Sequence, residues 1–419
     1  MSMQTPSQWP KEVCLVYEPI RVLGKGGFGS VVLARRRSDA PVDTVDADAT
    51  PEVAIKIVGS SEVSDKDVGY AHRELDILTE LSHPNIMKLL CYWEPAPEEH
   101  LCAAVMVLSL AKGPTLHDLI RNGGAVGFVF GRVVIAQLID ALSYIHSRAV
   151  VHRDIKGDNV IVSGATLEQD EIWDNDCMDD CDWGALIRKW HVTLIDFGFA
   201  RALTPADMKK KPPKGDPSTA LDVSTGSASS RSLKRSMSRQ FKRQMSAVGN
   251  RDYAAPEITQ KVQVRDPSMR GGRDILHTIS KHQAYYGLQV DAYSLGVLIR
   301  FALTGVPPHE NVQEFIAMHN SPLLRIAKVL CCSKKKEGER EIQYRSYKKI
   351  PGEVLRMIRG LTHYDPQQRT SIRTARRYPW VDDVIEGSGP GTTDVDYLNL
   401  VKSKSVAEDG STDPAEHEA

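Results

Sequence analysis

Three polar residues of different chemical types lie within six positions near the middle of the chain. Asp154, Lys156 and Asn159 stand between two β-branched runs, at 150–151 and 160–162. We expect these runs to pair as strands, so that the loop holds a proton acceptor, a cation and a metal ligand over one small volume. Phosphoryl transfer needs this combination, because positioning and charge neutralisation supply most of its catalysis. The alternative is a surface turn with unrelated polar residues, and motifs on both sides of the loop must decide.

A glycine-rich segment lies near the N-terminus, where residues 23–29 read Leu-Gly-Lys-Gly-Gly-Phe-Gly. The same glycine spacing occurs in dinucleotide-binding turns, which continue into a helix. Here the segment 30–34 favours a strand instead, so we predict a hairpin that folds over phosphates. Glycine suits this task because backbone amides approach the phosphate oxygens without a Cβ in the way.

A lysine interrupts an otherwise apolar strand pattern at 53–58, and its burial is costly unless the charge is paired. The alternative for Lys56 is an edge strand whose lysine reaches solvent; we favour a lysine that binds the α- and β-phosphates. The leucine spacing predicts a helix over 70–81 that ends at 82–85. Lys56 also needs an anion to orient it, and this helix carries the acids Glu74, Asp76 and Glu80.

The second half of the chain supplies the remaining candidate elements. Apolar residues at spacings of three and four predict an amphipathic helix over 132–146 that leads into the loop around Asp154. A buried strand follows at 192–195 and ends at Asp196-Phe197-Gly198. A carboxylate there can chelate Mg²⁺ between the β- and γ-phosphates. The segment 290–299 is apolar nearly all round and predicts a buried helix, which Gly305 ends.

In this order the motifs resemble the catalytic domain of eukaryotic serine/threonine protein kinases over residues 17–381. His152-Arg153-Asp154 with Asn159 is similar to the catalytic loop of that family. The resemblance implies an α+β, bilobal fold with a small β-rich lobe and one regulatory helix at about 17–108. A larger, mainly α-helical lobe is expected at about 109–381. It also implies an ATP- and Mg²⁺-dependent transferase.

The resemblance implies a role for each matching residue. Asp154 would accept or orient the proton of the substrate hydroxyl, Lys156 would contact the γ-phosphate, and Asn159 and Asp196 would hold Mg²⁺. The residues expected around the nucleotide are Leu23, Gly24, Lys25, Gly26, Gly27, Phe28, Gly29, Val31, Ala54, Lys56, Glu74, Leu108 and Ala111, with Leu108 at the back of the adenine pocket. Two further matches would be structural: Asp291 would hold the catalytic-loop backbone, and Arg369 would pair with Glu257.

A long segment from Asp196 to Glu257 corresponds to the activation segment, 62 residues by direct count. Its middle, 212–230, has a composition typical of disorder, and 231–251 holds basic residues and no acid. Ser246 completes an Arg-x-x-Ser sequence three residues before Gly249, where the resemblance places an activating phosphate. We therefore predict that Ser246 is phosphorylated, with Arg153 as the cationic partner of the phosphate. The chain itself and an upstream kinase are both candidates for this modification.

The sequence departs from the family pattern at Asn250, where serine/threonine kinases have threonine. An amide both donates and accepts hydrogen bonds, so it can still tie Asp154 to Lys156, but the preference for serine and threonine is left open. Asp158 and Glu310 are candidate readers of basic residues in substrates. Thr115 occupies the place where kinases that select arginine often have an acid.

Several segments are predicted to lie outside the common core. Residues 1–16 form a polar lead without clear structure, inserts are expected at about 37–52, 164–190, 205–245 and 331–349, and 382–419 form an acidic disordered tail. The insert at 164–190 contains Cys177 and Cys181. A metal site is a minor alternative there, because a structural zinc needs four ligands and no second pair lies nearby.

Composition argues against several other classes of protein. A formal charge of −1 argues against general nucleic-acid binding, and seven scattered cysteines do not indicate a disulfide framework. No apolar stretch approaches the roughly 20 residues of a membrane span, and no secretory signal is visible. We expect a cytoplasmic protein, with nuclear entry left open, whose partners are protein substrates. The oligomeric state stays undefined.

Two other functions compete with the kinase interpretation. A scaffold with a kinase fold but no activity would lack at least one of Lys56, Asp154, Asn159 and Asp196, and none is missing. A small-molecule phosphotransferase generally lacks an activation segment that ends in Ala-Pro-Glu, which here occupies 255–257.

Overall fold

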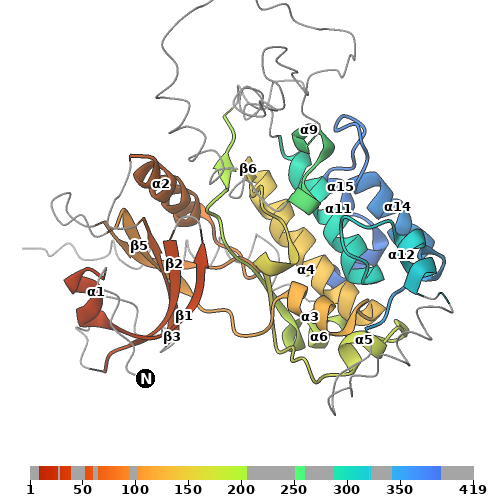
Figure 1. Cartoon of the computed structure of the whole chain (residues 1–419), viewed down its shortest axis with the longest axis horizontal. Coiled ribbons are helices and arrows are strands. Elements are labelled where there is room, and N and C mark those ends of the chain that lie inside the picture. The colour runs from red at the N-terminus through yellow and green to blue at the C-terminus, as the bar shows by residue number, and fades with distance from the viewer. Residues whose placement is uncertain are drawn as a thin grey trace, which may run out of the picture.

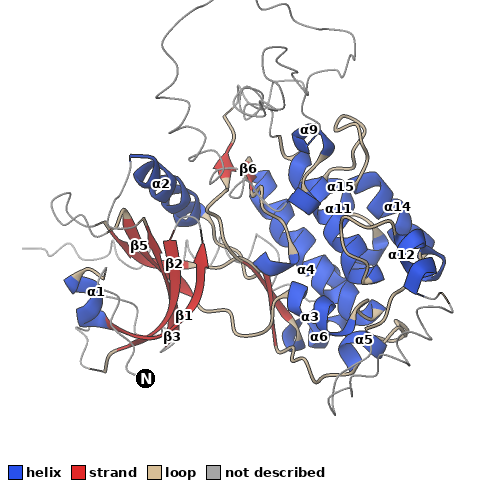
Figure 2. Cartoon of the chain, viewed as in Figure 1, coloured by secondary structure: helices blue, strands red, loops and turns tan. Residues whose placement is uncertain are grey.

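A five-stranded antiparallel sheet forms the first of two lobes (Figures 1 and 2). The computed structural model describes residues 9–26, 29–38, 52–59, 65–94, 102–204, 251–259, 287–319, 321 and 342–387. The strands are β1 (Tyr17–Gly26), β2 (Gly29–Arg36), β3 (Glu52–Val58), β4 (Leu89–Trp93) and β5 (Ala104–Ser109), in the spatial order β1-β2-β3-β5-β4. The fold class expected from the resemblance is confirmed.

One helix packs on the inner face of this sheet. The helix α2 (Asp65–Glu80) begins before the predicted range and buries Ala71, Leu75 and Leu78. These side chains share an apolar cluster with Met106 and Leu108 of β5. The helical spacing of leucines therefore marked the correct face, and Glu74 leaves α2 on the same side.

The polar lead expected at 1–16 is wrong for its second half. Residues Lys11–Val16 form the helix α1, and Val13 and Val16 are buried together with the preceding Trp9. These three side chains pack in a second apolar cluster, on the other face of the sheet. The segment is too short for a periodic apolar pattern to reveal it.

The second lobe is mainly helical and surrounds one helix, α4 (Phe128–Ser147). Its other helices are α3 (Leu116–Gly123), α5 (Glu171–Asp174), α6 (Trp183–Lys189), α9 (Pro256–Thr259), α11 (Gln289–Thr304), α12 (Val312–His319), α14 (Gly352–Leu361), α15 (Ile372–Ala375) and α16 (Pro379–Glu386). Among the described residues of this lobe, four short strands complete it: β6 (Val150–Val151), β7 (Val160–Ser163), β8 (His191–Leu194) and β9 (Arg201–Ala202).

The helix α4 differs from the amphipathic helix that was expected. Sixteen of its 20 residues are buried, because α5, α6, α11, α15, α16 and the strands β6 and β8 contact it from different sides. It is also long and apolar enough to match a membrane span, contrary to the expectation from sequence. Its burial within the lobe explains this apolar character, as in the core helices of other proteins.

The insert at 164–190 is folded onto the large lobe. Ile172 and Trp173 are buried, and the Asp176 carboxylate accepts a hydrogen bond from the backbone N–H of Phe128 and two from the Arg345 guanidinium. The cysteines of this insert are free thiols, and no group of three metal-binding side chains occurs among the described residues. Nearly all of the inserts at 37–52 and 205–245 lies outside the described residues, as do 331–341 and 388–419. The disordered tail expected from 382 onward is wrong for its first residues, because 382–386 belong to α16 and the apolar side chains of Val384 and Ile385 are buried in the large-lobe core.

The two lobes are joined by a short hinge. At its start the Ser109 N–H donates to the carbonyl of Lys88 over 2.8 Å, which ties the chain to the small lobe. At its end Gly113 has a φ of +154°, and a Cβ there would lie 2.2 Å from the carbonyl oxygen of Val162 in β7. Only residues 110–112 lie between these two attachments.

Candidate active site

The catalytic loop brings its three polar side chains together as predicted. The Lys156 ammonium lies 2.7 Å from Asp154 Oδ2, and the Asn159 amide donates to the same oxygen over 2.9 Å. The flanking strands do not pair with each other, however. The strand β6 pairs with β9 and β7 pairs with β8, so the loop is held between two separate ladders.

A buried carboxylate fixes the backbone of this loop. Asp291, at the start of α11, accepts hydrogen bonds of 2.8 Å from the backbone N–H groups of both His152 and Arg153. His146 at the end of α4 contacts the same carboxylate over 2.9 Å. Burial alone would raise the pKa of Asp291, but the hydrogen bond from His146 and the neighbouring charges lower it. The bond to the Arg153 N–H also stabilises the backbone conformation of that residue, whose φ of +67° is unusual for a residue other than glycine.

The His152 ring links the loop to the strand end at Asp196. Its Nε2 lies 3.3 Å from the carbonyl of Ile195, and its Nδ1 accepts the N–H of Asp154 over 3.3 Å. Only a neutral ring can donate at Nε2 while accepting at Nδ1. Burial lowers the pKa of His152, which agrees with this arrangement. The ring also packs edge-on against Phe197, with 4.8 Å between the ring centres.

The small-lobe lysine joins carboxylates from both lobes. Lys56 Nζ lies 2.6 Å from Glu74 Oε1 in α2 and 2.9 Å from Asp196 Oδ1 at the end of β8. Burial alone would lower the pKa of Lys56, but the charges of Glu74 and Asp196 raise it overall. Burial would likewise raise the pKa of Asp196, and the Lys56 ammonium brings it down to about 2. Lys56 and Asp196 are therefore both charged at neutral pH.

The residues predicted around the nucleotide base share one face of the sheet. Ala54 lies opposite Leu108 across β3 and β5, and Val31 lies opposite Lys56 across β2 and β3. Because side chains alternate along a strand, Ala54 and Lys56 point to the same side. Ala111 lies in the hinge between Leu110 and Lys112, and it is partly exposed.

The glycine-rich segment forms the hairpin that was predicted, with the strands β1 and β2 on either side. Gly24 pairs with Val31, and Lys25 and Gly26 pair with Ser30 and Gly29, the two residues that precede Val31 in β2. Leu23 is 39% exposed. Gly29 must be glycine, because its φ is +146° and a Cβ would lie 1.8 Å from the Ile57 carbonyl oxygen. Gly27 and Phe28 lie outside the described residues.

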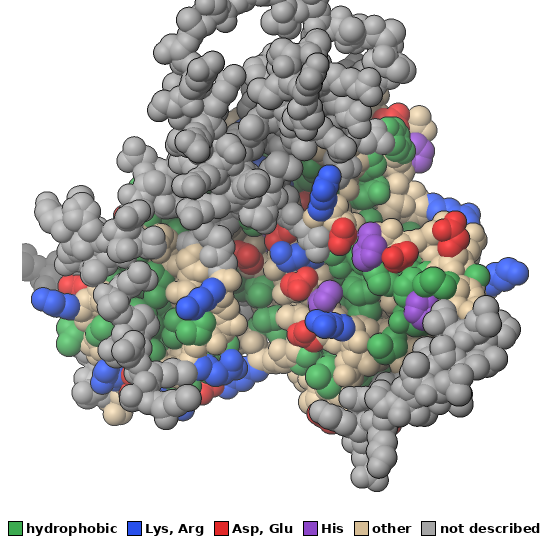
Figure 3. Space-filling model, in the orientation of Figure 1, with side chains coloured by type: hydrophobic (Ala, Val, Ile, Leu, Met, Phe, Trp, Pro, Cys, Tyr) green, Lys and Arg blue, Asp and Glu red, His purple; other side chains and the backbone are tan. Residues whose placement is uncertain are grey.

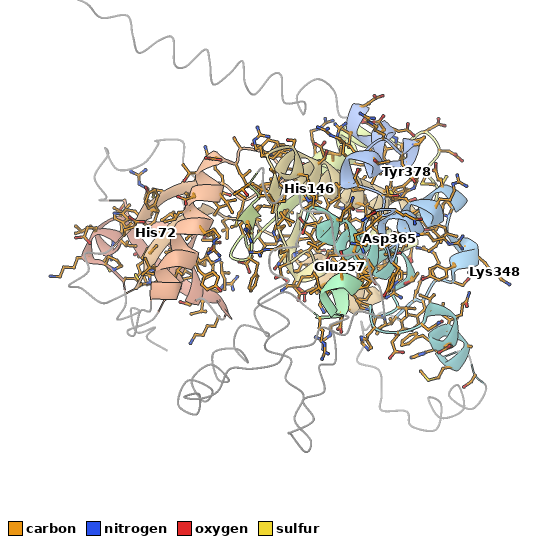
Figure 4. All side chains as sticks on the ribbon, turned by 90° about the horizontal axis from the view of Figure 1, so that it is seen from above. His72, His146, Glu257, Lys348, Asp365 and Tyr378 are labelled. Atoms are coloured by element: carbon orange, nitrogen blue, oxygen red, sulfur yellow. The ribbon has the colours of Figure 1, made fainter. Side chains whose placement is uncertain are left out.

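An ion pair anchors the end of the activation segment. The Arg369 guanidinium binds Glu257 in α9 through two hydrogen bonds of 2.7 and 2.9 Å, and its side chain is fully buried. Figure 4 labels Glu257 on this helix and His146 at the end of α4, both in the large lobe. Ser246 and Asn250 lie outside the described residues, and the Arg153 Nε donates to the carbonyl of Phe199 over 2.6 Å.

The candidate readers of substrate are exposed acids of the large lobe with histidine neighbours. Figure 3 shows acidic and histidine side chains close to one another on one face of this lobe. Asp158 is 3.9 Å from His117, and Glu310 is 3.4 Å from His309. Thr115 has a different role: its hydroxyl caps α3, accepting the Asp118 N–H over 3.0 Å. It is therefore a helix cap, and the carboxylate nearest to it is that of Asp118, which accepts a hydrogen bond from the Thr115 hydroxyl over 2.7 Å.

Sequence reasoning missed a buried amide network behind the site. The Asn85 amide donates to Gln137 Oε1 and to the carbonyl of Val192, each over 2.9 Å. The Gln137 amide in turn donates to the carbonyl of Trp190 over 2.8 Å. The network joins the turn after α2 to α4 and β8. A polar residue at 137, inside an apolar helix, was the signal that could have revealed it.

Comparison with known proteins gives a consistent result. The family model described as "Protein kinase domain" matches residues 17–218 and 227–381. A probable myosin light chain kinase of Dictyostelium discoideum is 22% identical over 383 residues, covering 91% of this chain and 57% of that protein. Aurora kinase A-B of Xenopus laevis is 25% identical over 373 residues, covering 88% and 63% respectively. The serine/threonine-protein kinase PkaA of Streptomyces coelicolor is 32% identical over 225 residues, covering 50% and 36%. The chain thus spans less than two thirds of the length of these relatives.

Proposed function

The chain belongs to the protein kinase domain family, and we propose that it transfers the γ-phosphate of ATP to serine and threonine hydroxyls of proteins. The observation that carries the proposal is the convergence of Asp154, Lys156 and Asn159 at hydrogen-bond distance. The Lys56 ammonium, bonded to both Glu74 and Asp196, adds a second cation from the small lobe.

Each side chain then has a task in the transfer. The Asp154 carboxylate, 2% exposed, receives or orients the proton of the attacking hydroxyl. The Lys156 ammonium beside it neutralises charge that develops on the transferred phosphoryl oxygens. Lys56 holds the α- and β-phosphates, and the hairpin at 24–29 covers them with backbone amides.

The family uses ATP with a divalent metal ion, and we assign Asn159 and Asp196 to Mg²⁺ in this chain. The donor set fits a hard cation, which prefers oxygen ligands. The Asn159 amide nitrogen donates to Asp154, so the amide oxygen is the ligand atom that it offers. Asp196 remains ionised because its pKa is about 2. When bound, the metal neutralises phosphate charge.

The proposal is tested by transfer of labelled γ-phosphate from ATP, with Mg²⁺, to a generic basic protein substrate. We expect label on serine or threonine, and a loss of about 10³-fold in Asp154→Asn, the range for removal of a general base. Asp76→Asn is the matched control, because it makes the same change at an exposed acid of α2 that has no part in the site. Equal label from wild type and Asp154→Asn would contradict the proposal and indicate a contaminating kinase.

We also propose that phosphorylation of Ser246 activates the enzyme. Support comes from its Arg-x-x-Ser context and from Arg153, whose backbone is fixed by Asp291 next to the catalytic aspartate. A phosphate there would gain charge-assisted hydrogen bonds from arginine. Mass spectrometry of active protein should find phosphate on Ser246, and Ser246→Ala should lower activity more than Ser238→Ala, which lies in the same Arg-x-x-Ser context. Active protein without phosphate on Ser246 would contradict this regulation.

A further inference from the structure

Residues 9–16 precede the part of the chain that the family model matches, yet they are part of the small-lobe core. Trp9 is 7% exposed, Val13 is fully buried and Val16 is 3% exposed. In Figure 1, α1 lies at the far left of the small lobe, beside the strands and away from α2. The helix α1 thus lies outside the matched range but inside the core of the small lobe.

The central strand β3 contacts this helix cluster on one face and the nucleotide site on the other. Val53, Ile55 and Ile57 point outward and belong to the same apolar cluster as the side chains of α1. Their exposed fractions are 1%, 0% and 1%. Ala54 and Lys56 alternate with them and point inward. The buried side chains of α1 and the outward side chains of the strand that carries Lys56 thus belong to one packed cluster.

We propose that Trp9, Val13 and Val16 are positioning residues for phosphoryl transfer, which hold β3 so that Lys56 meets the nucleotide phosphates. The inference rests on the proposed function for its catalytic consequence. Lys56 Nζ is held between Glu74 and Asp196, which come from α2 and from the other lobe. A strand that shifts outward withdraws Lys56 from both carboxylates, because the lysine side chain cannot lengthen.

The helix depends on the sheet for its own stability, since six residues cannot form a stable isolated helix. Two hydrogen bonds from Arg37 hold its C-terminal end: the backbone N–H donates to the carbonyl of Val16 over 2.9 Å, and the side-chain Nε donates to the carbonyl of Cys14 over 2.8 Å. Leu15 on the same helix is 66% exposed and takes no part in this packing. The helix and the outer face of the sheet consequently form and separate together.

The test compares three valine or leucine truncations. Val13→Ala removes buried contacts of α1, Leu15→Ala changes an exposed residue of the same helix, and Val354→Ala opens an equally buried site in α14 of the large lobe. Affinity for a non-hydrolysable ATP analogue with Mg²⁺ and amide hydrogen exchange of β3 are measured on the full chain, below the unfolding temperature of every variant. Transfer of labelled phosphate is measured beside them.

We expect Val13→Ala to weaken analogue binding about fivefold, the factor for 1 kcal/mol, and to speed exchange of the β3 amides by a similar factor. Leu15→Ala and Val354→Ala should leave both unchanged, although Val354→Ala lowers the thermal midpoint. Wild-type values for Val13→Ala, or an equal loss in Val354→Ala, would overturn the inference. Absence of phosphate transfer by the wild type would contradict the proposed function alone, because analogue binding and exchange are read without catalysis.

Discussion

The two lysines of the candidate site are held in opposite ways. Lys56 is bonded to carboxylates that lie 18 and 140 positions away along the chain, and its side chain is 9% exposed. Lys156 is bonded to Asp154, only two positions away, and its side chain is 23% exposed. The N–O distances are nearly equal, at 2.6 and 2.7 Å. Distance therefore does not separate these pairs; their burial and the origin of their partners do.

The comparison shows where each pair is vulnerable. In the catalytic loop, Asp154, Lys156 and Asn159 come from one short stretch, so their hydrogen bonds break only when the loop backbone moves. The hydrogen bonds of Asp291 hold that backbone in place. The small-lobe lysine depends on tertiary contacts of β3 with α2 and with the other lobe. A buried charge that loses such a partner is left uncompensated, which is costly.

We expect the largest effect when the side chain that supports the catalytic loop is removed. Asp291→Ala leaves the N–H groups of His152 and Arg153 and the His146 ring without their buried acceptor. We expect the free energy of unfolding to fall by about 4 kcal/mol, measured with urea at pH 7. Asp291→Asn should lose only about half of this, because an amide oxygen still accepts hydrogen bonds. Equal losses in the two variants would show that the loop needs only the charge.

The next largest effect is expected when the long-range ion pair between Lys56 and Glu74 is broken. Glu74→Gln should lower the free energy of unfolding by about 3 kcal/mol, the low end for broken buried pairs, because Asp196 still contacts Lys56. The urea midpoint reports this change. A loss below 1 kcal/mol would mean that Lys56 reaches solvent in solution, and the contrast between the two lysines would disappear.

A third prediction tests the ring that joins the loop to Asp196. The pKa of His152 is lowered in the folded protein, so the unfolded chain binds a proton that the folded protein does not. The stabilisation is present above about pH 6.5 and is lost as the pH falls, by at most about 1.4 kcal/mol per pH unit. Urea unfolding between pH 7.5 and 5.5 should show a smaller slope in His152→Phe. An unchanged slope would assign the pH dependence to other groups.

The smallest expected effect tests whether burial or short distance determines the strength of an ion pair. Lys189 and Glu171 lie 2.7 Å apart, as close as the catalytic pairs, but their side chains are 43% and 40% exposed. Glu171→Gln should change the free energy of unfolding by no more than about 0.5 kcal/mol, measured like Glu74→Gln. A cost equal to that of Glu74→Gln would show that short distance alone fixes the strength of these pairs.

The same contrast explains what the sequence could predict. The catalytic loop was predictable because Asp154, Lys156 and Asn159 are close neighbours in the chain, so their spacing alone brings them together. The partner of Lys56 required a match to a known family, because nothing local relates residue 56 to residue 74 or 196. The folded insert at 164–190 and the helix α1 were not predicted, since both are short and depend on tertiary contacts with Phe128, Arg345 and the sheet.

The prediction of an amphipathic helix over 132–146 was wrong because this helix is buried from several sides. The helix α4 looked amphipathic because its apolar spacing fits one face, but neighbours on every side bury the polar Arg132 and Gln137 as well. Their hydrogen bonds to backbone carbonyls at Trp380 and Trp190 satisfy these groups. Periodicity alone cannot show such satisfied polar residues.

The short hinge also constrains how the lobes can rotate. Ser109 is tied to the small lobe and Gly113 packs against β7, so within the hinge a change of angle between the lobes is taken up by the backbone dihedrals of residues 110–112. The turn after α2, which is bonded to Leu194 of β8, must adjust at the same time. Six φ and ψ angles then serve as the pivot. Ala111, which we expect beside the adenine ring, is the middle residue of this pivot. A bound base would therefore hold the axis about which the lobes turn, and nucleotide exchange and lobe opening would share one set of torsions.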